Sequence, residues 1–132
     1  EVSKAYQIAI RVEHKFGFDW LRDKLEAIEP DNDWELEYQD ILLGTLDSVK
    51  LLLLDVLHAS SKIDSSNITD DAWLTKALEE NSSSHLSSYF LALEQLRAGS
   101  LISLTTISVI LSRLDFLKKF KSTNLSVYSK LN

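Results

Sequence analysis

The chain has 132 residues, a formal net charge of −6 and no cysteine. Its length suits one domain, its negative charge argues against nucleic acid as a partner, and the lack of thiols excludes disulfides and cysteine chemistry. It has only 3 glycines and 1 proline, too few for the many tight turns of an all-β fold, so the composition favours long helices.

Two further features concern context. The longest uncharged run, residues 98–112, is too short to span a bilayer, and no signal-peptide pattern is present. We therefore expect a cytoplasmic protein that does not bind membranes. Because the chain contains no methionine, we expect residues 1–121 to be one helical bundle excised from a longer protein. A polar tail follows at residues 122–132.

Apolar residues that recur at three- and four-residue spacing predict an all-α fold, a bundle of about six helices. The expected helices are residues 2–15, 20–28, 33–60, 70–80, 85–98 and 103–120. Gly17 and Gly99 follow two of these helices and are typical helix-ending residues. Residues 60–69, rich in serine, are expected to be a loop.

Four side chains are candidates for the N-terminal caps of three helices. Asp19 is placed to cap the second helix, and either Asp31 or Asn32 the third. Thr69 is placed to cap the fourth. Pro30 should stop the second helix, because a proline moves the residue before it out of the α region.

The third helix carries a long apolar stripe. Its members are Trp34, Tyr38, Ile41, Thr45, Val49, Leu52 and Val56, and it is widened by Leu42, Leu46, Leu53 and Leu57. The run Leu51–Leu54 is apolar on most sides, which predicts a helix at the centre of the bundle, in contact with the segment 101–117. Gly44 is expected to mark a close helix crossing. Any apolar surface left on segment 101–117 would favour a homo-oligomer.

Three tryptophans stand in the first turn of an expected helix, each beside an acidic residue: Trp20, Trp34 and Trp73. Large aromatic side chains commonly anchor cores. We therefore expect all three rings to be mostly buried and to fasten the helix starts.

Few residues could carry chemistry. Asp55 and His58 share a helix face at i, i+3 spacing, but a di-metal bundle needs a second such pair and further glutamates. His14 stands alone, and His85 follows the serines 82–84 without the glycine-rich elbow of a serine nucleophile. The acidic run 26–37 lacks the central glycine of a calcium loop. No catalytic, cofactor-binding or metal-binding residue is therefore assigned.

Four segments carry a resemblance to a known family. They are GFDWL at residues 17–21, Trp34 with Leu46, the pair Trp73–Leu74, and the closing group Ile107, Ser108, Val109, Leu111, Arg113 and Leu114. In this order they resemble the C-terminal helical region of the large NAD-specific glutamate dehydrogenases. The resemblance covers about residues 6–117 and consists of helix anchors.

The resemblance implies a non-catalytic helical domain whose parent converts glutamate to 2-oxoglutarate with NAD. The catalytic residues and the dinucleotide-binding domain would then belong to the remainder of the parent polypeptide, with no cofactor in this piece. Two other readings remain open. The chain could be a free-standing helical module that binds a partner helix, or a small metalloenzyme that uses Asp55 and His58.

Overall fold

The computed structural model describes residues 2–65, 67–68, 70–78 and 83–120, and this part of the chain contains helices and no strand. The elements are α1 (Val2–Phe16), α2 (Phe18–Glu26), α3 (Asp33–Ile63), α4 (Asp71–Ala77), α5 (Ser83–Arg97), α6 (Leu104–Ser112) and the 3₁₀ turn η2 (Asp115–Leu117). The predicted all-α class with about six helices is confirmed. The tail predicted at residues 122–132 lies outside the described residues.

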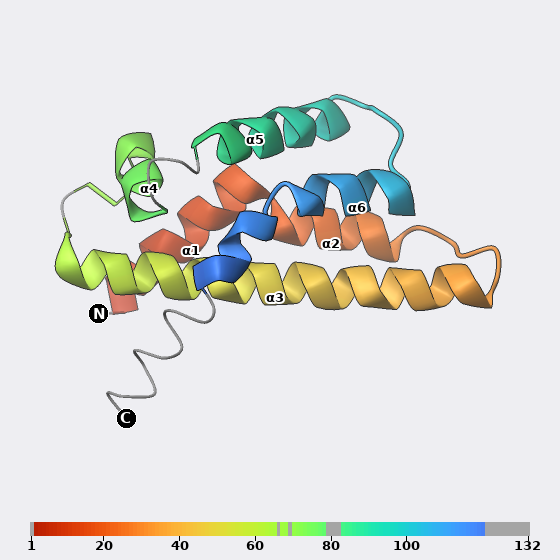
Figure 1. Ribbon diagram of the computed structural model, residues 1–132, viewed down its shortest axis with the longest axis horizontal. Coiled ribbons are helices and arrows are strands. Elements are labelled where there is room, and N and C mark those ends of the chain that lie inside the picture. The colour runs from red at the N-terminus through yellow and green to blue at the C-terminus, as the bar shows by residue number, and fades with distance from the viewer. Residues whose placement is uncertain (1, 66, 69, 79–82, 121–132) are drawn as a thin grey trace.

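The helices form three layers (Figure 1). The 31-residue helix α3 is the base, and α1 and α2 follow one another along it in the opposite direction. Helix α6 lies beside α2, and α5 lies on the side of this middle layer that faces away from α3. The base contacts α1, α2, α4, α6 and η2, so the core lies between α3 and α5.

A single glycine makes the corner between α1 and α2. Gly17 has φ 62° and ψ 36°, a left-handed conformation that side chains disfavour. Its N–H donates to the carbonyl of Glu13 at 2.8 Å, which ends α1 as predicted. The guanidinium of Arg97 on α5 occupies the position that a Cβ would take. A substitution here would be strained in its backbone and also blocked by α5.

The cap of α2 comes from the preceding helix. The carboxylate of Glu13 accepts the N–H of Asp19 at 2.8 Å and that of Trp20 at 3.4 Å. The predicted cap by Asp19 is wrong, because Asp19 stands inside the first turn of α2 and its carboxylate instead pairs with Lys50 of α3 at 2.9 Å. A carboxylate still stabilises this helix start through the exposed N–H groups, but it arrives from across the corner.

Aromatic side chains fill the space beneath the corner. The rings of Phe16 and Phe18 stack at 5.5 Å, and Phe90 meets Phe16 edge-on at 5.0 Å. The hydroxyl of the fully buried Tyr89 donates to the carbonyl of Phe16. Burial raises the pKa of Tyr89, so this phenol stays protonated and keeps its role as a donor. The cluster therefore joins α1, α2 and α5.

The start of α3 is fixed by polar side chains. Asn32 accepts the N–H of Glu35 at 2.9 Å, as one of the two predicted caps, while Glu35 accepts the N–H of Asp31 at 3.0 Å. Further along, the amide of Gln39 donates to the carbonyls of Leu25 and Ile28, both at 2.8 Å. This buried amide thus satisfies the open carbonyls at the end of α2, which stops before Pro30 as expected.

The ends of the later helices differ from the predictions in two places. Helix α3 continues past the expected loop start to Ile63, where the buried Ser61 donates to the carbonyl of His58 at 2.7 Å. Helix α4 is capped by Asp70, which accepts the N–H of Ala72 at 2.8 Å, and the expected cap Thr69 lies outside the described residues. Gly99 ends α5 as predicted, with φ 111°.

The segment predicted as one helix over residues 103–120 bends in the structure. Ser103 and Thr106 form a reciprocal cap at the start of α6, but the helix ends at Ser112, whose hydroxyl donates to the carbonyl of Val109 at 2.6 Å. Such a bond competes with helical pairing. The bend carries the buried residues Leu114 and Leu117 onto the base.

The described residues cover helix α3 on one side, which corrects its predicted central position. Its neighbours lie above it in Figure 1, and within the run 51–54 Leu53 is fully buried whereas Leu51 is 62% exposed. The expected contact of this helix with α6 is present. Gly44 makes no close crossing, because a Cβ built there would meet no atom within 4 Å.

The tryptophans have three different environments. Trp73 is buried as predicted, and its ring nitrogen donates to the carbonyl of Asp64 at 3.1 Å. Trp20 is half-buried, with the guanidinium of Arg97 5.5 Å above its ring. The prediction for Trp34 is wrong: its side chain is 69% exposed. This exposure agrees with the position of the first turn of α3, which extends beyond α2 and α6 (Figure 1).

These environments predict opposite outcomes for two substitutions. Trp73→Ala removes a buried ring and its hydrogen bond, so we expect a loss of about 3–5 kcal/mol in the free energy of unfolding. Trp34→Ala removes an exposed ring, and we expect a change within about 0.5 kcal/mol. Urea unfolding followed by circular dichroism measures both. Equal shifts in the two midpoints would show that Trp34 is covered in solution.

Candidate functional site

The residues that could bind a metal do not come together. Asp55 is exposed on α3 and His58 is half-buried one turn away. His14 is exposed on α1, and His85 on α5 stacks on Phe116 with 5.2 Å between ring centroids. Among the residues that the structure describes, no group of three or more His, Asp or Glu side chains could hold a metal ion. The structure thus gives the pair Asp55 and His58 no third ligand within this part of the chain.

The serine cluster lies at a helix start. Ser83 and Ser84 begin α5, and Ser82 lies outside the described residues. One turn further on, the hydroxyl of Ser88 accepts a hydrogen bond from the guanidinium of Arg113. This bond ties α5 to the end of α6, which is a structural use of the hydroxyl.

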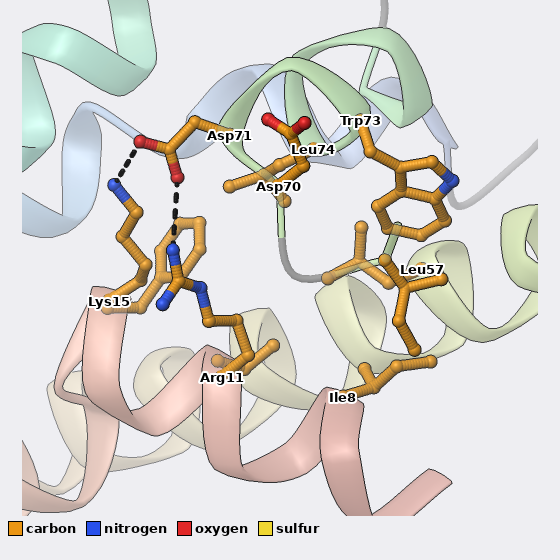
Figure 2. Close-up of a pocket in the computed structure, with 11 residues that line it drawn as sticks. Ile8, Arg11, Lys15, Leu57, Asp70, Asp71, Trp73 and Leu74 are labelled. Carbon is orange, nitrogen blue, oxygen red and sulfur yellow. Dashed lines mark hydrogen bonds and ion pairs between the residues drawn. The ribbon is translucent and has the colours of Figure 1, made fainter. Parts of the chain in front are cut away.

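A small cavity lies beneath α4 (Figure 2). Its lining consists of apolar side chains, two cationic side chains and two carboxylates: Ile8, Val12, Phe16, Leu57, Ile68, Trp73, Leu74, Arg11, Lys15, Asp70 and Asp71. Its volume is about 10 Å³, the space of one water. Small-molecule sites usually measure about 300–1,000 Å³, so this cavity is a packing feature.

An ion triad closes that cavity. The carboxylate of Asp71 at the start of α4 forms ion pairs with the Lys15 ammonium at 2.9 Å and the Arg11 guanidinium at 3.3 Å, both from α1 (Figure 2). The hydrogen bond from Lys15 is the main cause that lowers the pKa of Asp71; partial burial opposes it and Arg11 adds to it. The triad fastens the short helix α4 to α1.

An open groove lies on the outer flank of α3. It has a volume of about 740 Å³ and is lined by Ile41, Gly44, Thr45, Ser48, Val49, Leu51, Leu52, Asp55 and Lys118. Apolar and hydroxyl side chains dominate this lining, with one carboxylate and one ammonium group. Lys118 reaches it from the segment that follows η2. Gly44 deepens the groove, because no side chain projects there.

Exposed apolar residues extend this groove toward the start of α3. Ile41 is 58% exposed and Trp34 is 69% exposed, with the half-buried Tyr38 between them and its ring 5.5 Å from that of Trp34. The sequence predicted these residues to belong to the apolar core stripe of the helix. Of that stripe only Val49 and Val56 are buried, together with the residues expected to widen it: Leu42, Leu46, Leu53 and Leu57. The candidate functional surface is therefore the outer flank of α3.

Within the described residues, none of the helices combines the length and the apolar character needed to cross a bilayer.

The groove predicts the effect of a methyl group at Gly44. Because this helical position faces open space, Gly44→Ala should raise the free energy of unfolding by about 0.5–1 kcal/mol through the higher helix propensity of alanine. Gly17→Ala is the matched control and should destabilise, because of its positive φ and the adjacent Arg97. Chemical unfolding of both variants tests this; destabilisation by Gly44→Ala would mean that the groove is filled.

The ion triad predicts a pH dependence. The folded-state pKa of Asp71 lies below its ordinary value, so the carboxylate contributes stability above that ordinary value and loses it as the pH falls through the folded pKa. Its side chain is 63% exposed, which keeps the contribution under about 1 kcal/mol. Asp71→Asn should therefore destabilise slightly at pH 7, and the difference should disappear as the pH falls through the folded-state pKa of Asp71. A Lys15→Gln double-mutant cycle checks the pairing, and fully additive losses would contradict it.

No family model, no curated protein and no solved structure matches this chain.

Proposed function

We propose that this chain is a non-catalytic helical domain of a large, cytoplasmic NAD-dependent glutamate dehydrogenase, in which it supports assembly or regulation. The parent converts glutamate to 2-oxoglutarate. The observation that carries the proposal is the order of the four resembling segments together with the positions that their residues take in the bundle.

The first two segments lie at helix starts. Gly17 makes the corner with its φ of 62°, and Leu21 behind it has no exposed surface. Trp34 stands in the first turn of α3, and Leu46 further along is buried. Gly17, Leu21 and Leu46 thus turn the chain and pack two successive helices, whereas Trp34 is exposed.

The last two segments lie in the core. Trp73 and Leu74 are the buried side chains of α4. Ile107, Leu111 and Leu114 are buried along and just beyond α6. Most residues of the four segments therefore supply corners and packing, as expected of a domain that gives shape to a larger enzyme, whereas Trp34 and Val109 lie on the surface.

The cofactor of the proposed parent would bind elsewhere in that enzyme. A dinucleotide-binding loop needs three glycines within six residues, so that the backbone can approach the pyrophosphate. The three glycines here are Gly17, Gly44 and Gly99, too far apart to form one. The NAD site and the catalytic residues would thus belong to the rest of the parent polypeptide, which would also be the main partner of this domain.

The proposal predicts that the chain does not bind NAD by itself. Calorimetric titration with NAD should give no saturable heat, and a dehydrogenase with its own nucleotide domain is the positive control. A dissociation constant below about 1 mM, or roughly 4 kcal/mol of binding free energy, would contradict the proposal. Sequencing the coding DNA upstream of Glu1 tests the parent directly, because a dinucleotide-binding domain should be encoded there; a stop codon or an unrelated domain would refute it.

A second candidate function is a free-standing helical interaction module. The open groove on α3 favours it, because helix-binding modules use apolar grooves of this kind. The upstream sequence separates the two candidates: a free-standing module would have no catalytic domain in the same reading frame.

A further inference from the structure

We propose that two copies of this chain pair through their α3 helices in antiparallel orientation, about a two-fold axis that passes between Leu46 and Asp47. The contact surface, here called the α3 seam, consists of Trp34, Tyr38, Ile41, Thr45, Ser48, Leu52, Asp55 and Ala59. The pairing goes beyond the dehydrogenase proposal and does not rest on it.

The seam has the spacing of a coiled-coil surface. Its residues alternate at intervals of four and three along α3, the repeat that keeps one helix face against a partner helix. All eight are exposed or half-buried, and the more buried residues of α3 lie on the adjacent flank. One helix thus carries two stripes, of which the described part of the bundle covers one.

The seam is complementary to itself. Reversing the helix about the midpoint between Leu46 and Asp47 places Trp34 opposite Ala59, Tyr38 opposite Asp55, Ile41 opposite Leu52 and Thr45 opposite Ser48. In a two-fold dimer each of these layers occurs twice, because the same patch is used by both copies.

Each layer joins side chains that suit one another. The large ring of Trp34 meets the small Ala59, and Ile41 meets Leu52 in an apolar layer. The hydroxyl of Tyr38 can donate to the carboxylate of Asp55, a charge-assisted hydrogen bond. The central layer pairs the hydroxyls of Thr45 and Ser48, which can bond to each other or to water.

Charges along the seam favour the antiparallel direction. The start of α3 is acidic, with Asp33 and Glu37 exposed, whereas the last turn carries the exposed Lys62. Antiparallel pairing brings the acidic end of one copy to the basic end of the other. A parallel pair would place Trp34 on Trp34 and Asp55 on Asp55, and like charges in contact are unfavourable.

The shape of the groove also favours a helix as its occupant. The seam runs from Trp34 to Ala59, about 39 Å at a rise of about 1.5 Å per residue, and its deepest part is the open groove of about 740 Å³. Segment 101–117, the surface first expected to oligomerise, is largely covered: Ile107, Ile110 and Leu111 are buried. The apolar surface available for a second copy therefore lies on α3 and not on segment 101–117.

Sedimentation velocity from ~1 to ~100 µM tests the dimer, a range chosen for a modest interface. The mass of the wild-type chain should rise from one copy toward two. Ile41→Lys should weaken association by ~10-fold or more. Leu91→Lys is the matched control, because Leu91 on α5 is equally exposed at 58% and lies off the seam; it should leave association unchanged.

Disulfide trapping tests the orientation, since the chain has no cysteine of its own. A mixture of Ile41→Cys and Leu52→Cys chains should form a mixed cross-linked dimer on oxidation, in large excess over the products of either variant alone. Cross-linking of Ile41→Cys to itself would show a parallel pair and overturn the proposal. A chain that stays monomeric would also overturn the proposal. Dimerisation only after removal of residues 121–132 would overturn it as well, because it would mean that these residues occupy the α3 seam of their own chain.

Discussion

The structure depends on the corner at Gly17. Helices α1 and α2 lie in series along α3 because one residue in the left-handed region turns the chain without a loop. The turn leaves the N–H groups of α2 open, and Glu13 closes them from the preceding helix. It also leaves the carbonyl of Phe16 for the buried hydroxyl of Tyr89. The N–H groups of Asp19 and Trp20 and the carbonyl of Phe16 thus receive partners, and two of the helices become coupled to α5 at the same point.

Much of this fold could be predicted because its signals are local. Asn32 caps a helix that begins at the next residue, and Gly17 and Gly99 end helices at their own positions. The caps that were missed come from further away. Glu13 reaches Asp19 across a corner, so a search for a capping residue next to the helix selects Asp19 itself. The contact of Tyr89 with Phe16 spans 73 residues, and no local pattern carries information about it.

The outer flank of α3 was misassigned for a related reason. Periodicity identifies an apolar stripe but does not say what covers it. Helix α3 carries two adjacent stripes, with Leu42 and Leu53 on one and Ile41 and Leu52 on the other. Only the positions of α1, α2 and α6 decide which stripe becomes the core, and those positions follow from corners elsewhere in the chain. The exposure of Trp34 agrees with the extension of α3 past its neighbours, a matter of relative helix length.

The bend after Ser112 links the core to the proposed contact surface. Because α6 ends there, Leu114 and Leu117 turn down onto α3 and complete the covered side of the base. The same descent places Lys118 at the rim of the groove, beside Asp55 and Leu52. The segment 113–117, which completes the core, thus also forms the edge of the covered side of α3. A helix so long can keep one flank for its own bundle and present the other to a partner, and on α3 the boundary between the two flanks lies at this descending segment.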